Sequence, residues 1–172
     1  MGILIQMFIF FFIIANAEAR PISYNGGHTV MALSDNIKNS MYYHYSPTYK
    51  YSIGVEFLED KLFNKNYSFL RLTYLLNRKN TKNSQRNLYF QSGINPERTK
   101  NIFYGIHGDW ETRRLFSGFS LKRTENGYKN YTDKFIQLGF TPYLGDYGDL
   151  HSWIMIKSKK NSFSNSWSTY PL

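Results

Sequence analysis

The chain has 172 residues, no cysteine and a formal net charge of +9, with aromatic residues making up 19% of it. This length is enough for one domain, and the lack of cysteine excludes disulfides and thiolate metal sites. The basic charge is compatible with nucleic acid, anionic lipid headgroups or acidic glycans as partners, although lysines and arginines in solvated loops explain it more simply.

Residues 1–19 have the pattern of a signal peptide. The stretch from Ile3 to Ile14 is almost continuously apolar, and small residues follow in the sequence ANAEA, where the A-x-A pattern occurs twice. Cleavage is therefore expected after Ala17 or Ala19. The apolar run is shorter than the roughly 20 residues that a helix needs to cross a bilayer. We assign 1–19 to a signal peptide and 20–172 to a single exported domain.

Apolar and polar residues alternate with a period of two along most of the exported part, which predicts β-strands rather than helices. The high content of tyrosine and phenylalanine agrees with this interpretation. The expected strands cover residues 28–33, 40–46, 49–57, 67–77, 84–93, 101–108, 113–122, 131–141 and 151–157, and a further run begins at 166. Because consecutive strands follow one another with short connections, we predict an antiparallel up-and-down meander of about nine to ten strands.

The connections are expected to alternate in length. Shorter turns are predicted at 47–48, 78–83, 109–112 and 145–149, and mostly longer loops at 58–66, 94–100, 124–130 and 159–165. Short turns on one rim and longer loops on the other are typical of outer-membrane β-barrels. With the N-terminus in the periplasm, the longer loops would lie outside the cell.

Each predicted strand has one apolar face and one face of small or polar residues. The polar side chains expected to line the interior are His44, Glu56, Arg71, His107, Arg114, Gln137, His151 and Lys157. A soluble barrel of the lipocalin type turns its apolar face inward, whereas a membrane barrel turns it toward lipid. Alternation alone does not distinguish the two. Glycines on the polar face (Gly54, Gly105) and tyrosines near strand ends (Tyr74, Tyr104) favour the membrane barrel.

Two of these interior residues, Glu56 and Arg71, lie on consecutive strands and are expected to form an ion pair. The histidines offer weaker chemistry. His151 and Met155 share a face and are donor types that suit copper, but four strand residues separate them by about 13 Å. Single hydrogen-bonded histidines are the simpler interpretation, so no metal or cofactor is predicted.

The turn residues Gly145, Asp146, Gly148 and Asp149 form a GDYGD motif. Its aspartates are too sparse for a calcium loop and suit a tight turn. His151 and Ser152 are adjacent in sequence, so their side chains point to opposite faces of a strand and do not form a catalytic dyad. With no nucleophile motif, we predict that the protein is not an enzyme.

Nucleic-acid binding is the alternative that the charge suggests, but the basic residues scatter through 78–82, 113–114, 122–123 and 157–160. They do not follow one strand face together with aromatic residues, as a nucleic-acid-binding surface would. This distribution favours rim and loop positions, near anionic lipid headgroups, and no nucleic-acid partner is expected.

Two segments, YHYSPTYKYSIGVEF early in the chain and YLGDYGDLHSWIMIK late in it, resemble an uncharacterised family of exported bacterial β-barrel proteins. The resemblance covers most of the exported part. It implies an outer-membrane location in a Gram-negative cell and carries no catalytic residues. The family ends in a strand with a terminal aromatic residue, whereas this chain ends in TYPL, which suggests a member truncated at its C-terminus.

The sequence therefore predicts an all-β outer-membrane barrel with a structural or transport-like role, which truncation at the C-terminus would leave incomplete in strands. Its expected partners are outer-membrane lipid and the barrel-assembly machinery during insertion. The alternatives are a soluble periplasmic barrel that carries an apolar ligand inside and, less favoured by the residues, a barrel enzyme or metal-binding protein.

Overall fold

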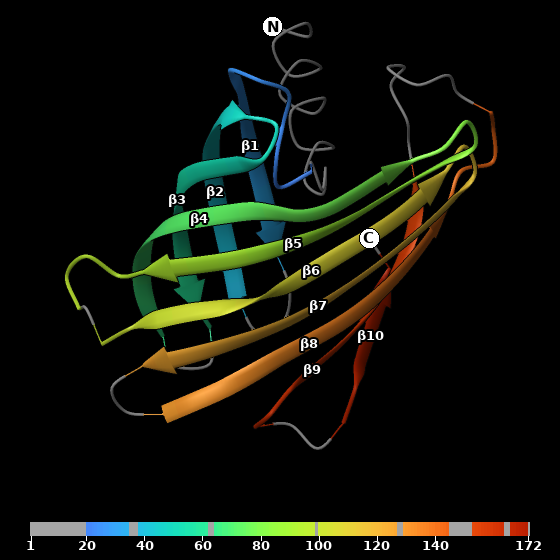
Figure 1. Ribbon diagram of the computed structural model, residues 1–172. Coiled ribbons are helices and arrows are strands. Elements are labelled where there is room, and N and C mark those ends of the chain that lie inside the picture. The colour runs from blue at the N-terminus through green and yellow to red at the C-terminus, as the bar shows by residue number, and fades with distance from the viewer. Residues whose placement is uncertain are drawn as a thin grey trace, which may run out of the picture. The chain divides into compact units, whose positions relative to one another are not determined.

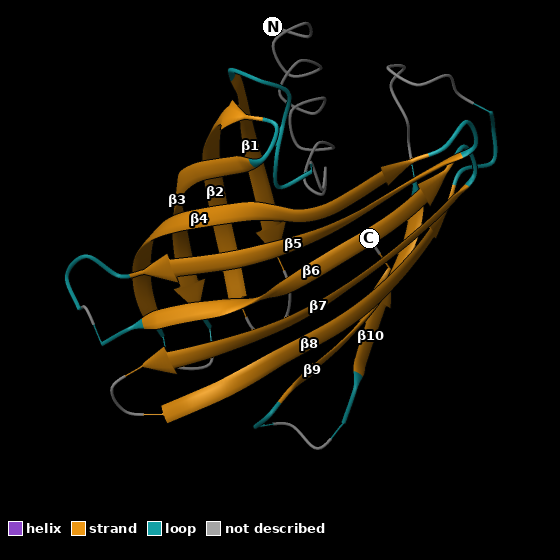
Figure 2. Ribbon diagram, viewed as in Figure 1, coloured by secondary structure: helices purple, strands orange, loops and turns teal. Residues whose placement is uncertain are grey.

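The computed structural model of this chain describes residues 20–34, 38–61, 64–98, 100–126, 129–144, 153–163 and 166–171. Within these residues all regular structure is β-strand and there is no helix (Figure 2). The structure thus confirms the predicted all-β fold. The predicted signal peptide, residues 1–19, lies outside the described part of the chain.

Ten strands form an antiparallel meander in which each strand pairs with the next one in the chain (Figure 1). They are β1 (Gly27–Ser34), β2 (Lys38–Thr48), β3 (Tyr51–Asp60), β4 (Lys65–Asn80), β5 (Ser84–Ile94), β6 (Ile102–Thr112), β7 (Leu115–Asn126), β8 (Lys129–Phe140), β9 (Ile154–Asn161) and β10 (Ser168–Pro171). Among the described residues β1 and β10 are the two end strands and do not pair with each other, so the described sheet is not closed.

The chain divides into two compact units, one up to Arg71 and the other from Leu72 onward. The first unit contains β1 to β3 and the first part of β4. Its register places Thr29 of β1 opposite His44 of β2, and His44 opposite Gly54 of β3. A Cβ at Gly54 would collide with the carbonyl oxygen of Tyr43 and would lie 2.8 Å from the Cβ of His44. This close approach of neighbouring strands requires glycine at that position.

The second unit contains the rest of β4 and continues to β10. Its strands keep a regular register, in which one row of partners runs Phe90, Ile106, Leu121, Lys134 and Lys160 across β5 to β9. Every residue in such a row points to the same side of the sheet, because cross-strand partners share a face. A residue's face is therefore known from its row as well as from its own strand.

Burial alternates along the strands, and its sense is the reverse of that in a soluble protein. On β2 the apolar Met41 is exposed while His44 and Ser46 are fully buried. On β8 Leu138 is 61% exposed and its neighbour Gln137 is 1% exposed. Since soluble proteins bury leucine and expose glutamine, each of the two units has its polar face inside and its apolar face outside.

Several predicted connections lie elsewhere in the structure. The segment 47–48, predicted as a turn, is the end of β2, and the turn that follows is made by Tyr49 and Lys50. The segment 109–112, predicted as a turn, is the end of β6, and the turn that follows is made by Arg113 and Arg114. The Thr112 hydroxyl stabilises this turn by accepting hydrogen bonds from the backbone N–H groups of Arg114, at 3.2 Å, and Leu115, at 2.9 Å. The predicted loop 124–130 is mostly strand, because β7 reaches Asn126 and β8 begins at Lys129.

β8 ends at Phe140 and β9 begins at Ile154. The turn predicted between them at 145–149 lies outside the described residues, as do its motif residues Gly145, Asp146, Gly148 and Asp149 and the candidate His151.

Candidate functional site

A buried ion pair lies at the centre of the polar face of the first unit. Arg71 on β4 donates a hydrogen bond from Nη1 to Oε2 of Glu56 on β3 at 3.2 Å, and the two side chains are 10% and 4% exposed. The guanidinium carbon of Arg71 lies 4.1 Å from the ring centroid of Tyr42, which faces Glu56 in register on β2. The pair predicted from the sequence is present, and a cation–π contact adds to it.

His44 continues this polar face along β2. Its ring centroid lies 5.0 Å from that of Tyr42, with an angle of 37° between the planes. The side chain is fully buried, and neither ring nitrogen has a hydrogen-bond partner among the described residues. His44 therefore lies inside, as predicted, where it packs against an aromatic ring.

Three polar side chains are linked by hydrogen bonds on the inward face of β4 to β6 in the second unit. Arg78 on β4 donates from Nε to Oδ1 of Asn87 on β5 at 2.7 Å, and Asn87 donates from Nδ2 to Oδ1 of Asp109 on β6 at 2.6 Å. Asn87 and Asp109 are buried and directly opposite each other in register. The amide of Asn87 thus links a positive and a negative side chain across three strands.

A second polar region lies between β8 and β9. Lys157 places its Nζ 4.2 Å from the ring centroid of Phe135, and Asn161 donates from Nδ2 to Oδ1 of Asp133 at 2.8 Å. Gln137, which faces Lys157 in register, lies with its Nε2 3.8 Å from the sulfur of Met155. Gln137 and Lys157 are buried, in agreement with the face predicted from alternation.

The remaining predicted interior residues have different positions. His107 is half-buried on β6, with its ring centroid 5.9 Å from those of Tyr89 and Phe135. Arg114 was predicted on the polar face of a strand, but it is exposed in the turn between β6 and β7. The correction follows from the position of that turn, because a turn residue belongs to neither face of the sheet.

Sequence reasoning missed Tyr42, Asn87, Asp109, Asp133 and Asn161 as interior polar residues. Asp109 was expected in the turn 109–112, and Asn161 was expected in the loop 159–165. The signal that would have found them is an asparagine and an aspartate on adjacent strands, but their pairing depends on a register that the sequence does not give.

The outward face of the second unit is lined with exposed apolar side chains. On β5 to β9 they are Phe90, Ile94, Tyr104, Ile106, Trp110, Leu115, Phe119, Leu121, Ile136, Leu138, Phe140, Ile154 and Ile156. We call this set the apolar band. Monomeric soluble proteins rarely expose a contiguous apolar surface of this extent, so the band indicates a surface that meets an apolar environment.

The apolar band has an oblique limit at the end of the strands where β7 passes to β8. The last exposed apolar residue at this end is Ile156 on β9, Ile136 on β8, Leu121 on β7, Tyr104 on β6 and Ile94 on β5. In the order β9, β8, β7, β6, β5, the cross-strand pairing shows that the limit moves at each strand by two residues toward the end of the sheet where β7 passes to β8. The limit therefore crosses the sheet at a constant slant relative to the strands.

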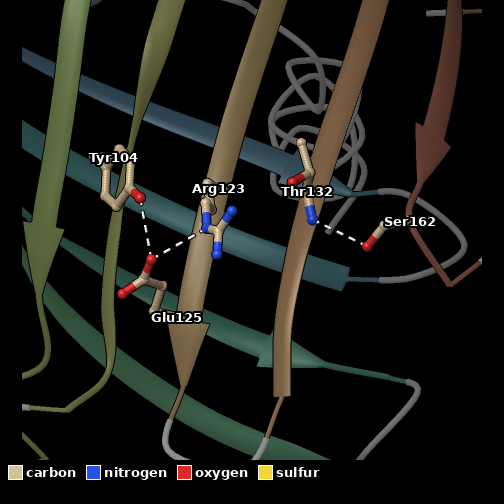
Figure 3. A network of polar contacts seen from close by, with 5 residues as sticks. All are labelled: Tyr104, Arg123, Glu125, Thr132 and Ser162. Atoms are coloured by element: carbon tan, nitrogen blue, oxygen red, sulfur yellow. Dashed lines mark hydrogen bonds and ion pairs between the residues drawn. The ribbon is translucent and has the colours of Figure 1, made fainter.

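On β7, β8 and β9 the next outward residues beyond this limit are polar: Arg123, Lys134 and Ser158. Glu125 accepts hydrogen bonds through Oε1 from the hydroxyl of Tyr104 at 3.0 Å and from Nε of Arg123 at 3.1 Å (Figure 3). On the adjacent strand the backbone N–H of Thr132 donates to the Ser162 hydroxyl at 3.1 Å (Figure 3). The outward face thus changes within one or two rows from apolar residues to a tyrosine and charged residues.

The described residues contain no group of three or more histidine, aspartate or glutamate side chains placed to hold a metal ion. The described part of the chain also contains no helix that is long and apolar enough to cross a membrane. Comparisons with protein-family models, curated proteins and solved structures found no match to this chain.

Proposed function

We propose that this protein crosses a membrane as an outer-membrane-type β-barrel, in a structural or transport-like role and without enzymatic activity. The observation that carries the proposal is the inverted burial of the strands. Leu138 and Ile156 face outward while Gln137 and Lys157, one residue away on the same strands, are buried. Lipid around the protein makes this arrangement favourable, because the apolar side chains then leave water.

The magnitudes support lipid rather than water as the environment. Burying a large aliphatic or aromatic side chain is favourable by about 1.5–3 kcal/mol relative to leaving it exposed. The apolar band contains more than ten such side chains in the second unit, and the first unit exposes Val30, Met41, Tyr43, Ile53 and Phe57 as well. In water this surface would forfeit a free energy as large as the whole stability of a typical domain.

The alternative of a soluble barrel with an apolar ligand inside requires the opposite arrangement of faces. Its interior would have to present leucine, isoleucine and phenylalanine to the ligand. In the first unit the inward positions of β2 are instead Tyr42, His44 and Ser46, and the ion pair of Glu56 and Arg71 lies beside them. An ion pair and polar side chains do not suit an apolar ligand.

The slant of the apolar band supports the membrane proposal independently. Strands of membrane barrels are tilted by roughly 35–45° from the barrel axis, so a layer of constant depth crosses them obliquely. With strands about 4.8 Å apart and a rise of about 3.3 Å per residue, such a layer shifts by about one to one and a half residues per strand, and the observed limit shifts in one constant direction, by two residues per strand. Tyr104 at the limit and the charged residues Arg123 and Glu125 beyond it are of the types found where lipid meets water.

Membrane insertion requires that every strand edge be paired, because lipid supplies no hydrogen bonds to the backbone. The described sheet leaves β1 and β10 at its two ends. In the membrane, these edges have to be satisfied by pairing beyond that of the described residues. The barrel-assembly machinery is the expected partner during insertion, and outer-membrane lipid is the expected partner afterwards.

Fractionation of the expressed full chain tests the proposal. The protein should appear in the outer-membrane fraction, require detergent for extraction, and migrate faster on a gel when it has not been heated. A soluble protein in the osmotic-shock fraction would contradict the proposal and favour the ligand-carrying barrel. Loss of the gel shift in a membrane-associated protein would mean that it lies on the bilayer without crossing it.

A further inference from the structure

We propose that Lys134 on β8 and Lys160 on β9 form a binding site for the phosphate of an anionic lipid headgroup. This inference rests on the membrane-spanning function proposed above. The two lysines are direct cross-strand partners and lie on the outward face, in the row that also contains Leu121. Like charges directly opposite each other on adjacent strands destabilise a sheet, so this pair needs an anion to be favourable.

The protein itself supplies no carboxylate at this place among the described residues. The neighbour of Lys134 on the other side is Leu121, and the outward residues next to it on β8 are Thr132 and Ile136. The nearest outward carboxylate in the described rows, Glu125, is engaged by Arg123 and Tyr104. The anion that balances the two lysines is therefore expected to come from outside the chain.

The position of the pair relative to the apolar band selects a lipid. Lys134 is the first outward residue beyond Ile136, which is the last exposed apolar residue of β8. Cross-strand partners place their Cβ atoms about 4.5–5.5 Å apart, so both ammonium groups are able to reach one phosphate. Leu121 and Ile136 would lie against the acyl chains of the same lipid, a contact that a free phosphate or a nucleic acid would not use.

Arg123 adds a third cation at the next row, because its cross-strand partner is Thr132, two residues from Lys134 on β8. Its Nε is held by Glu125, which fixes the guanidinium at the end of the band (Figure 3). Arg123 thus extends the positive surface around the lysine pair, and its charge is partly offset by the glutamate. The lysine pair remains the centre of the proposed site.

The test uses the full chain in lipid nanodiscs made of phosphatidylcholine, with or without phosphatidylglycerol. Native mass spectrometry measures how many phosphatidylglycerol molecules stay bound to the protein. Each lysine near an anionic headgroup contributes an affinity of roughly five-fold, so K134Q/K160Q should weaken the retention of phosphatidylglycerol by about thirty-fold. The control K79Q/K82Q removes the same charge from exposed rim positions at the opposite ends of the strands, where Lys82 lies in a turn and the two lysines are not cross-strand partners, and should weaken the retention much less than K134Q/K160Q.

A second variant separates binding from folding. Lys134→Glu places a carboxylate opposite Lys160, so it should fold at least as well as the wild type in pure phosphatidylcholine and yet lose the preference for phosphatidylglycerol. Added inorganic phosphate should not displace the lipid from the wild type, and displacement at millimolar concentration would indicate a site for free phosphate and overturn the lipid assignment.

Two failures are distinguishable. A wild-type protein that does not enter the nanodiscs overturns the membrane-spanning function and this inference with it. A protein that enters them, shifts on heating and retains phosphatidylglycerol equally in the wild type, K134Q/K160Q and Lys134→Glu overturns the headgroup site alone.

Discussion

Glu56 and Arg71 lie 3.2 Å apart on adjacent strands, and the ring of Tyr42 covers the same guanidinium. The arrangement gives one arginine both an ionic and an aromatic partner in a place where neither charged side chain is exposed. A buried pair of this kind is weak support for stability as a whole, but the loss of one partner removes a compensating charge from the buried charge that stays. Three variants measure that difference.

The single variants Glu56→Gln and Arg71→Met should each lower the free energy of unfolding by about 3–5 kcal/mol. The double variant E56Q/R71M should lose less than the sum of the two, because it removes both charges of the pair together. Urea unfolding in detergent micelles measures all three. Additive losses would mean that the two charges do not interact in the folded protein.

The environment of the outward face is tested with two leucines of nearly equal exposure. Leu138 in the middle of the apolar positions of β8 is 61% exposed, and Leu144, beyond the end of β8, is 62% exposed. Leu138→Arg should destabilise the folded protein in a bilayer by about 2–4 kcal/mol, because the charge lies at lipid depth. Leu144→Arg should have little effect. Equal stability of both variants in lipid would contradict the proposed membrane exposure of β8.

The packing of β6 against β7 is tested with two glycines of the inward face. A Cβ at Gly105 would collide with the carbonyl oxygen of Leu121 and would lie 2.8 Å from the Cα of Lys122, whereas a Cβ at Gly118 would meet only side chains at 3.3 Å or more. Gly105→Ala should therefore destabilise the protein by about 1–3 kcal/mol, since backbone does not yield as a side chain does. Gly118→Ala should be nearly neutral. Thermal melts of both variants in detergent check this order.

The link through Asn87 gives a fourth prediction. Asn87→Ala removes hydrogen bonds to Arg78 and Asp109, both of them charged, and should lower the free energy of unfolding by about 2–4 kcal/mol. Asn77 on β4 is exposed, and Asn77→Ala serves as the control with an expected change below about 0.5 kcal/mol. A similar small change in both variants would show that the link contributes nothing measurable.

Much of the fold was predictable from the sequence because the side-chain period of a strand is independent of its partners. The residues of β3 and β4 alternate clearly enough that Glu56 and Arg71 could be assigned to one face and expected to pair. The sequence did not distinguish an apolar interior from an apolar exterior, since both give the same alternation. Only the burial of Gln137 beside the exposure of Leu138 separates these arrangements.

The errors share one physical cause. Asp109 and Trp110 look like turn residues in isolation, yet Asp109 is held inside β6 by Asn87 on the neighbouring strand. The turn therefore lies at Arg113 and Arg114 instead of at 109–112, and Arg114 is in the turn and not in a strand. Such a shift depends on cross-strand contacts between residues distant in sequence, which local turn propensity does not contain.

The oblique limit of the apolar band also constrains the register between neighbouring strands. A shift of the register by two residues between β7 and β8 would leave every side chain on the same face, so the alternation of polar and apolar residues does not disfavour it. In the membrane-spanning arrangement proposed above, the same shift would displace Lys134 into the acyl layer or push Ile136 into the headgroups. The thickness of the bilayer would then disfavour registers that the pattern of faces alone would accept.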